Sequence, residues 1–327
     1  MSKVWLGVNV SDDVLALLES RVEVIGPRSD PNPPDSIEGV EDADAAIICP
    51  TFPANQATFD RLPNLRIVTR PGAGYDNVDV EAATACGICV VRTADSNTES
   101  TAVFTVAMML NAVRRIKMGD GLLRDGRWMP LPELTAFDLN GATLGIIGLG
   151  RIGGRVAEIA HVLGMQVIAY DPYIDEGRAV SLRTRLIPDL PTLLNQADVV
   201  TLHVPANAET RGIIGAAELS QMKRGAVLVN CARGPILVEA DLVDALNHGQ
   251  LSAAALDVWD PEPPAADNPL LHMPNVIATP HMAAKTDEGQ HRSRLSAAQQ
   301  TILALKGQIP SGLVNLEVWD RRRLPSQ

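Results

Sequence analysis

Short runs of Val, Ile and Ala alternate with longer helical patterns along most of this chain, and the alternation occurs in two separate series. Parallel strands joined by crossover helices produce such a pattern, because each strand is buried on both faces. The first series predicts strands at 4–8, 22–25, 45–49, 66–69 and 88–91, and the second at 143–147, 166–170, 199–202, 226–230, 253–257 and 276–279. We therefore expect an α/β protein with two parallel sheets, a small one and one of about six strands, and a cleft between two domains.

Two long helical patterns predict how the domains are connected. The stretch NTESTAVFTVAMMLNAVRRIKMGDGLL (97–123) is apolar nearly all round until Arg114, and Asn97 can cap its start. We expect one long buried helix that crosses between the domains. A second pattern over 287–306 should carry the chain back, so that the tail at 307–319 finishes on the first domain. The predicted domains are 1–98 with 288–327, and 99–287.

Length and charge exclude several classes of protein. A chain of 327 residues suits two domains of ordinary size. The net charge of −11 leaves no basic face for a duplex, and the compact basic run at 321–323 lies near the end, so we expect no nucleic-acid partner. No stretch reaches the roughly 18 apolar residues of a membrane span, and residues 1–10 lack the features of a signal peptide. We expect a cytoplasmic protein without membrane contact.

The Pro-rich stretches at 30–39 and 260–269 indicate loops.

The four cysteines stand at positions 49, 86, 89 and 231. Cys86 and Cys89 have the spacing of a redox motif or of half a zinc site, but no second pair completes a tetrahedral site. The stretch GICVVRT has the pattern of a buried strand, in which cysteine acts as a small apolar residue. We therefore predict a structural role for this pair and no metal.

The stretch LGIIGLGRIGGRVAEIAHVLGMQVIAYDP (144–172) combines a strand, three spaced glycines, a helical pattern, a second strand and an acid. In such a turn Gly148, Gly150 and Gly153 allow a tight bend, close approach of a pyrophosphate and close helix packing. Asp171 follows the second strand, where an acid accepts the ribose hydroxyls of NAD. A 2′-phosphate at about 4 Å from this carboxylate would be repelled by roughly 1 to 4 kcal/mol, so we expect NADH to be preferred over NADPH. The alternative is that Asp171 forms a turn before the following proline.

Ligands of parallel sheets bind beyond the carboxyl ends of the strands, so polar residues that follow predicted strands are candidates. In chain order these residues are His203, Arg233, Glu262 and His281. Arg233 can grip a substrate carboxylate, and His281 can act as the acid in reduction and the base in oxidation. Glu262, if bonded to His281, would favour the charged imidazolium. Three such residues beside a nicotinamide site predict reversible hydride transfer at a carbon that bears oxygen.

Other candidates have two interpretations each. In the first domain RPGAGYDNVD (70–79) exposes amides at Ala73 and Gly74 that could cradle an anion. Arg151 is either a donor to a pyrophosphate or a solvated first-turn residue. His203 is either a residue at the edge of the cofactor or a structural one.

Six stretches of the chain, RPGAGYDNVDVEAA, LGIIGLGRIGGRVA, ADVVTLHVPANAETRGIIG, GAVLVNCARGPIL, ALDVWDPEPP and NVIATPHMAA, resemble the D-isomer-specific 2-hydroxyacid dehydrogenases. The resemblance covers nearly the whole chain. It implies two Rossmann-like domains, one flavodoxin-like and one NAD-binding, and an NAD-dependent oxidoreductase that interconverts a 2-oxo acid and a D-2-hydroxy acid of the glyoxylate or hydroxypyruvate type. It also implies a homodimer joined through the NAD-binding domains.

The resemblance assigns roles to particular residues. It implies that Arg233 binds the substrate, that Glu262 partners His281 and that the amides of Ala73 and Gly74 bind the substrate carboxylate. Asp257 would contact the nicotinamide carboxamide. The residues implied around the cofactor are Thr105, Gly148, Gly150, Arg151, Ile152, Gly153, Asp171, His203, Val204, Pro205, Thr210, Cys231, Ala232 and Asp257.

Some features depart from the family pattern or leave alternatives. Val103 and Phe104 precede Thr105 where many relatives have Glu followed by His or another side chain. Lys285 stands where small or neutral residues are common, and it either contacts an acidic substrate group or is solvated. The chain stops soon after VNLEVW, so we expect no regulatory domain. The alternatives to the main prediction are a phosphoglycerate dehydrogenase-like activity, a non-catalytic NAD-sensing protein of the same fold, and formate oxidation, against which Glu262 argues.

Overall fold

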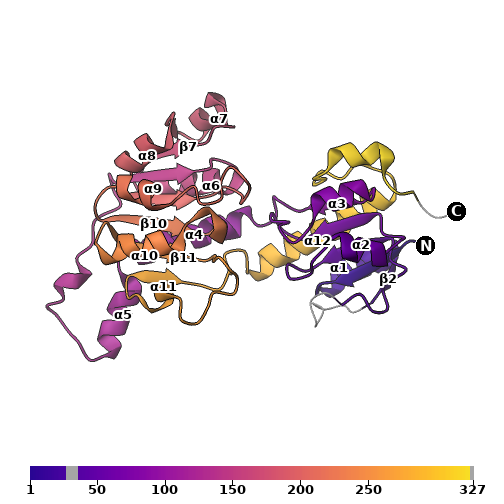
Figure 1. Cartoon of the computed structure of the whole chain (residues 1–327), viewed down its shortest axis with the longest axis horizontal. Helices are drawn as coiled ribbons and strands as arrows, with labels where there is room; N and C mark the ends of the chain where they lie inside the picture. The colour runs from indigo at the N-terminus through magenta and orange to yellow at the C-terminus, as the bar shows by residue number, and fades with distance from the viewer. Residues whose placement is uncertain (27–35, 325–327) are drawn as a thin grey trace. The chain divides into compact units, whose positions relative to one another are not determined.

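The computed structural model describes residues 1–26 and 36–324, which form two compact units. The N-terminal unit consists of Met1–Asn97 and Lys285–Gln327, and the central unit of Thr98–Ala284 (Figure 1). Residues 30–35 of the first predicted Pro-rich loop lie outside the described residues. Each unit contains one parallel sheet with helices packed on it, which confirms the predicted α/β fold class.

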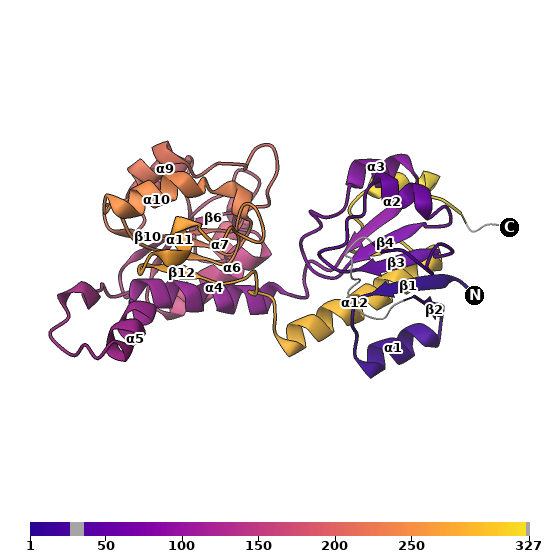
Figure 2. The same ribbon diagram turned by 60° about the horizontal axis from the view of Figure 1, so that its bottom comes forward.

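The N-terminal unit is a five-stranded parallel sheet in the order β2-β1-β3-β4-β5, the flavodoxin-like order. Its strands are β1 (Lys3–Gly7), β2 (Glu23–Ile25), β3 (Ala45–Ile48), β4 (Ile67–Arg70) and β5 (Cys89–Arg92). Its helices are α1 (Asp12–Glu19), α2 (Gln56–Arg61), α3 (Val80–Ala85) and α12 (Asp287–Leu305), with η3 at Leu316–Arg321. Figure 2 shows α2 and α3 on one face of the sheet and α1 and α12 on the other.

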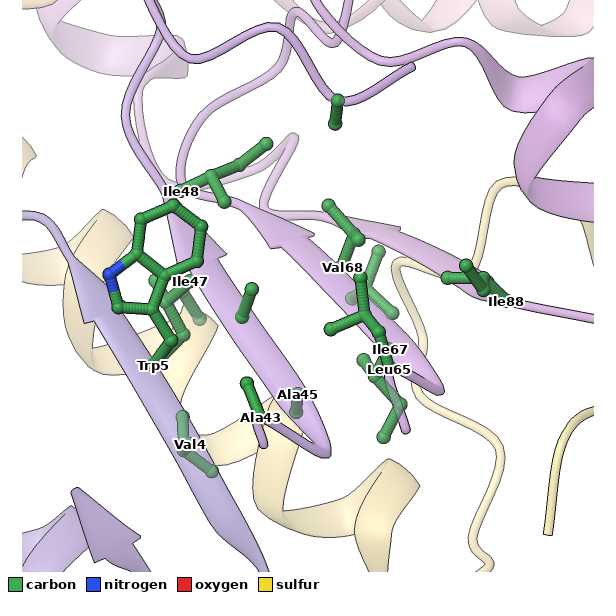
Figure 3. Close-up of a cluster of buried hydrophobic side chains, with 14 of the residues drawn as sticks. Val4, Trp5, Ala43, Ala45, Ile47, Ile48, Leu65, Ile67, Val68 and Ile88 are labelled. Atoms are coloured by element: carbon green, nitrogen blue, oxygen red, sulfur yellow. The ribbon is translucent and has the colours of Figure 1, made fainter. Parts of the chain in front are cut away.

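The core of this unit consists of aliphatic side chains from the strands and a few aromatic rings. Figure 3 shows Trp5 beside Ile47 and Ile48 of the neighbouring strand. The Trp5 ring meets Phe52 edge-on, with centroids 4.7 Å apart. Buried aromatic pairs of this kind add to the stabilisation from burial.

The C-terminal tail packs on β5 through backbone and side-chain hydrogen bonds. The Val314 amide donates to the Val90 carbonyl at 2.8 Å. The buried Asn315 side chain accepts from the Val90 amide at 2.9 Å and donates to the Ile88 carbonyl at 3.0 Å. These bonds satisfy backbone groups of β5, which is the last strand of this sheet in the described part of the chain.

The central unit is a seven-stranded parallel sheet in the order β12-β11-β10-β9-β6-β7-β8. Its strands are β6 (Thr143–Ile147), β7 (Gln166–Tyr170), β8 (Arg185–Leu186), β9 (Val199–Leu202), β10 (Ala226–Asn230), β11 (Leu251–Leu256) and β12 (Val276–Ala278). The prediction of about six strands missed β8, which is two residues long and begins with a charged residue. The strand order reverses between β6 and β9, and such a switch point is where open α/β sheets bind ligands.

Helices cover both faces of this sheet. They are α4 (Thr98–Val113), α5 (Ile116–Arg124), α6 (Arg151–Val162), α7 (Glu176–Ser181), α8 (Leu190–Gln196), α9 (Ala216–Gln221), α10 (Glu239–Asn247) and α11 (Pro269–His272), with η1 at Pro132–Leu134 and η2 at Gly234–Ile236. The core on one face includes residues of α4 and α6, and the core on the other face includes residues of α8, α9 and α10. Figure 2 shows α4 on the side of the sheet opposite to α9 and α10.

The single long helix predicted over 97–123 is wrong, because the chain breaks it between α4 and α5. Arg115 has a φ of 54°, in the left-handed region, and so ends the regular helical path. α4 is buried on much of its surface, whereas α5 has no buried residue. No helix in the described parts of the chain is long and apolar enough to cross a bilayer.

Candidate active site

The glycine turn lies between β6 and α6 at the switch point of the sheet. Gly148 has a φ of 94°, and a Cβ on it would lie 2.8 Å from the His203 carbonyl oxygen. A Cβ on Gly153 would lie 2.1 Å from the Gly148 carbonyl oxygen. Both positions therefore require glycine, the first for its conformation and contact with the next loop, the second for close packing of α6 against the turn.

Gly150 differs from the other two glycines, because a Cβ there would meet nothing within 4 Å. It is the N-cap of α6, and no side chain caps that helix. The first amides of a helix and its dipole favour an anion, and an open glycine lets that anion approach the backbone. The turn therefore fits the pyrophosphate of a dinucleotide.

Asp171 follows β7 and binds two backbone amides. Its Oδ2 accepts from the Leu149 amide of the glycine turn at 2.8 Å, and its Oδ1 accepts from the Tyr173 amide at 2.9 Å. A carboxylate has about four acceptor positions, so each oxygen retains capacity for a ribose hydroxyl. Asp171 therefore forms the turn that was the alternative prediction, while remaining able to accept from a ribose.

The loop after β9 carries His203 and Thr210. The imidazole Nε2 of His203 lies 3.0 Å from the Thr201 hydroxyl, and burial lowers the pKa of His203 to about 4. His203 is therefore neutral at neutral pH and is no proton donor there. The Thr210 hydroxyl accepts from the Asn207 amide at 2.9 Å and donates to the Pro205 carbonyl, so it organises the loop itself.

The loop after β10 is shaped by Asn230, which sequence reasoning missed. This buried side chain accepts from the Ala232 amide at 3.0 Å and donates to the Arg233 carbonyl at 2.9 Å. The neighbouring Cys231 is buried, and its burial, with the charge of Asp257, raises the pKa of its thiol to about 12. Cys231 is therefore an uncharged thiol.

Arg233 immediately precedes η2, whose first residue, Gly234, packs against the loop that follows β11. A Cβ on Gly234 would lie 1.9 Å from the Trp259 carbonyl oxygen, so only glycine fits this contact. The charge of Arg233 helps to lower the pKa of Glu262. One guanidinium donor, Nη1, bonds the Ala232 carbonyl at 2.6 Å.

Asp257 is fully buried and holds the segment that carries His281. Its Oδ1 accepts from the Thr279 hydroxyl at 2.6 Å and from the Met282 amide at 2.9 Å, and its Oδ2 accepts from the Ala283 amide at 2.8 Å. The His281 amide donates to the Asp257 carbonyl at 2.8 Å. His281 itself has a φ of 49°. Backbone in this region is uncommon for a side-chain-bearing residue, and these bonds hold it there.

Glu262 and His281 form a hydrogen-bonded pair. The His281 Nδ1 lies 2.8 Å from Glu262 Oε2, and Glu262 Oε1 accepts from the Trp259 amide at 3.1 Å. Burial alone would raise the pKa of Glu262, but the bond and charge of His281, the Trp259 amide and Arg233 lower it below its usual value. The carboxylate therefore stays charged near neutral pH and orients the ring with Nε2 as the outward nitrogen.

The predicted anion-binding loop of the N-terminal unit lies between β4 and α3. Among the described residues, no acceptor bonds the amides of Ala73 and Gly74. The loop is held by Thr93, whose hydroxyl accepts from the Gly72 amide at 2.6 Å, and by Arg92, which donates to the Ala73 carbonyl at 3.2 Å. Two available amides in succession suit a carboxylate oxygen.

The structure also places the other predicted residues. Thr105 is buried in α4 and its hydroxyl donates to the Thr101 carbonyl at 2.8 Å. Half-buried residues of the cofactor set are Ile152, Val204 and Ala232, and exposed ones are Arg151 and Pro205. Val103 is half exposed on α4, and Lys285 is exposed. Asn97 was predicted to cap the helix that begins at 98, but its side-chain oxygen is buried without a hydrogen-bond partner among the described residues, so it accepts no helix amide there.

The four cysteines are all free, and Cys89 is buried in β5. In the described part of the chain, no three His, Cys, Asp or Glu side chains are grouped so that they could hold a metal ion.

Comparisons with known proteins show which family the chain resembles. Residues 106–283 match the model of the NAD binding domain of D-isomer specific 2-hydroxyacid dehydrogenases. A glyoxylate reductase of Korarchaeum cryptofilum is 41% identical over 286 residues, 86% of each chain. The crystal structure of the TT0316 protein of Thermus thermophilus has a TM-score of 0.86 at 34% identity, covering 96% of this chain and 100% of that one.

A longer relative shares the same identity. A D-3-phosphoglycerate dehydrogenase of Methanocaldococcus jannaschii is 41% identical over 280 residues, 86% of this chain but 53% of the relative. The chain thus spans about half the length of that relative.

Proposed function

The chain belongs to the D-isomer specific 2-hydroxyacid dehydrogenase family, and from this we propose that it is an NAD-dependent enzyme that interconverts a 2-oxo acid and a D-2-hydroxy acid. The observation that carries the proposal is the Glu262–His281 pair, 2.8 Å apart, on the loops at the edge of the sheet that bears the glycine turn. The charge of Arg233 acts on the same carboxylate. A nucleotide turn and an acid–base pair on one edge are what hydride transfer to a carbonyl requires.

We assign different residues to substrate binding and to proton transfer. Bound NADH supplies the hydride that adds to C2 of the 2-oxo acid. We assign the substrate carboxylate to the guanidinium of Arg233. For the amides of Ala73 and Gly74 we propose the binding of a carboxylate oxygen. In reduction, the Nε2 proton of His281 passes to the carbonyl oxygen, and in oxidation the same nitrogen takes the hydroxyl proton. Glu262 stabilises the imidazolium that precedes the proton transfer.

Two further assignments concern the cofactor. The glycine turn, where Gly150 leaves the backbone accessible, would bind the pyrophosphate. Asp171 at the end of β7 would accept hydrogen bonds from the ribose. A carboxylate at this ribose repels a 2′-phosphate, which supports a preference for NADH over NADPH. We assign Asp257 to the nicotinamide carboxamide, and we assign His203 and Cys231, both uncharged, to the residues that line the cofactor.

For the substrate we favour glyoxylate or hydroxypyruvate, with phosphohydroxypyruvate as the alternative. The names of the relatives in Korarchaeum and Methanocaldococcus support these two choices, respectively. A cytoplasmic location is supported by four free cysteines, since reduced thiols persist in reducing compartments.

We propose that two copies associate through the central unit. Helix α5 has no buried residue, and apolar side chains on it and just after it are exposed, namely Ile116, Leu123, Trp128 and Met129. Such a concentration of exposed apolar side chains marks an interaction surface. Light scattering should give the mass of a dimer, and a monomer that persists at micromolar concentration would contradict this.

The reaction is tested by following NADH absorbance with glyoxylate, hydroxypyruvate, phosphohydroxypyruvate and longer 2-oxo acids. We expect NADH oxidation with at least one of them. If NADH binds but no member of the panel is reduced, the alternative of a non-catalytic NAD-sensing protein of the same fold is favoured instead.

A further inference from the structure

One chain of hydrogen bonds joins three loops at the carboxyl edge of the seven-stranded sheet. The Leu149 amide donates to Asp171, and the Tyr173 amide donates to the other oxygen of the same carboxylate. The Tyr173 hydroxyl in turn donates to Glu209 Oε2. These residues follow β6, β7 and β9, which are neighbours in the sheet. The proposed reaction uses Asp171 but gives no role to Tyr173 or Glu209.

Glu209 is held in place from its own loop as well. Its amide donates to the Asn207 side-chain oxygen at 2.9 Å, and the Thr210 amide donates to the same oxygen at 3.1 Å. Among the described residues Glu209 forms no ion pair, and the next cation in the chain, Arg211, pairs instead with Asp260 at 3.6 Å. The negative charge of Glu209 is therefore not neutralised by a neighbouring cation.

The Tyr173–Glu209 bond has little to contribute to folding. The Tyr173 side chain is largely exposed, at 78%, and Glu209 is exposed too. A hydrogen bond between exposed groups adds little to stability, because water competes for both partners. The bond to Glu209 raises the pKa of the Tyr173 phenol, so the hydroxyl remains a donor at neutral pH. What the bond does is tie the Glu209 carboxylate to the same residue, Tyr173, whose backbone amide bonds Asp171.

We propose that Tyr173 holds Glu209 beside Asp171, so that two carboxylates rather than one flank the ribose 2′ position of the dinucleotide, and that Glu209 is a second determinant of the preference for NADH over NADPH. This inference rests on the proposed function. NADH carries a neutral hydroxyl at that position, whereas the 2′-phosphate of NADPH carries up to two negative charges that Glu209 repels. Asp171 also supports the glycine turn, so Glu209 is the carboxylate whose sole assigned role is discrimination.

The test compares dissociation constants of NADH and NADPH, measured by calorimetry, for the parent and three variants. Glu209→Gln keeps an oxygen that accepts from Tyr173 but removes the charge. We expect it to tighten NADPH binding by about three- to tenfold at low salt and to change NADH binding less than twofold. Tyr173→Phe keeps the negative charge of Glu209 but removes the hydrogen bond that holds its carboxylate in place. We expect a smaller decrease in the dissociation constant of NADPH. In both cases the effect should shrink as salt rises, because exposed charges are screened.

The matched control is Glu176→Gln, which changes the net charge by the same amount. Glu176 lies in the first turn of α7, in the same connection as Tyr173. We expect less than a twofold change in either constant. If Glu176→Gln and Glu209→Gln lowered the dissociation constant of NADPH equally, the inference would be overturned. Loss of any nearby negative charge, rather than that of Glu209, would then explain the effect.

The remaining outcomes separate this inference from the proposed function. A parent protein that binds NADH, with Glu209→Gln leaving the NADPH constant unchanged, would overturn the role of Glu209 alone. A parent that binds neither nucleotide would contradict the proposed function and, with it, this inference.

Discussion

At the scale of single residues, the candidate site depends on side chains that hold other groups in place. Asp257 bonds three donors in the segment 279–283, and Glu262 bonds both His281 and the Trp259 amide. The positions of Arg233, Glu262 and His281 after strands made them candidates from sequence, because the carboxyl ends of parallel strands share an edge. The anchoring by Asp257 and Asn230 could not be predicted, because it depends on the loop conformations that bring backbone amides to them.

Replacing His281 tests the proton transfer. We expect His281→Ala to lower turnover by about 10² to 10⁴-fold, the usual contribution of a positioned acid or base, with little change in NADH affinity. Steady-state kinetics and NADH binding measured on the same preparation separate the two. His248→Ala is the control, because among the described residues the side chain of that exposed histidine bonds only its own helix, through the Asp244 carbonyl. Unchanged turnover in His281→Ala would remove the acid–base role.

His203 makes stability depend on pH. Its pKa is about 4 in the folded chain and about 6.5 when unfolded, so between these values the unfolded state binds the additional proton. The free energy of unfolding is therefore fully retained above about pH 6.5 and falls as the pH decreases, by about 2 kcal/mol at pH 5 from this group. Urea denaturation at several pH values should show that the free energy of unfolding falls less steeply with decreasing pH in His203→Gln than in the parent. Identical pH dependence in the parent and the variant would contradict the buried, neutral histidine.

At the scale of elements, hydrophobic pattern predicted the long strands, because burial on both faces leaves a continuous apolar run in the sequence. It failed at β8, where two residues at the sheet edge pair with β7 and carry no such signal. It also failed between α4 and α5, because the left-handed Arg115 interrupts a pattern that continues through it. Neither feature contains a glycine or proline that would mark it.

The contact between η2 and the loop after β11 gives a prediction at this scale. In Gly234→Ala the new Cβ would meet backbone atoms of Trp259, which no side-chain rotation relieves. We expect a lower melting temperature and loss of turnover, since Arg233 must move away from Glu262. Gly121→Ala in α5 has open space around the new methyl group, and it should be neutral or stabilise by about 0.5 to 1 kcal/mol. A Gly234→Ala protein with parental melting temperature and activity would contradict the contact.

At the scale of the whole molecule, the two sheets differ in what they contribute. The flavodoxin-like N-terminal unit carries two available amides at Ala73 and Gly74, whereas the central unit carries the nucleotide turn and the ionisable groups. The doubled β/α series in the sequence predicted this division, because each series is long enough to bury its own core. The substrate side chain could not be predicted, since its pocket depends on loop shape rather than on pattern.

The central claim is that the protein reduces a 2-oxo acid with NADH to a single enantiomer of the 2-hydroxy acid. In this reaction His281 and Glu262 supply the proton, and Arg233 binds the substrate. The most direct measurement is the chirality of the product, by chiral chromatography after the protein has reduced hydroxypyruvate or pyruvate with NADH. The account predicts the D-2-hydroxy acid. Formation of the L enantiomer, or of a racemic product, would contradict it.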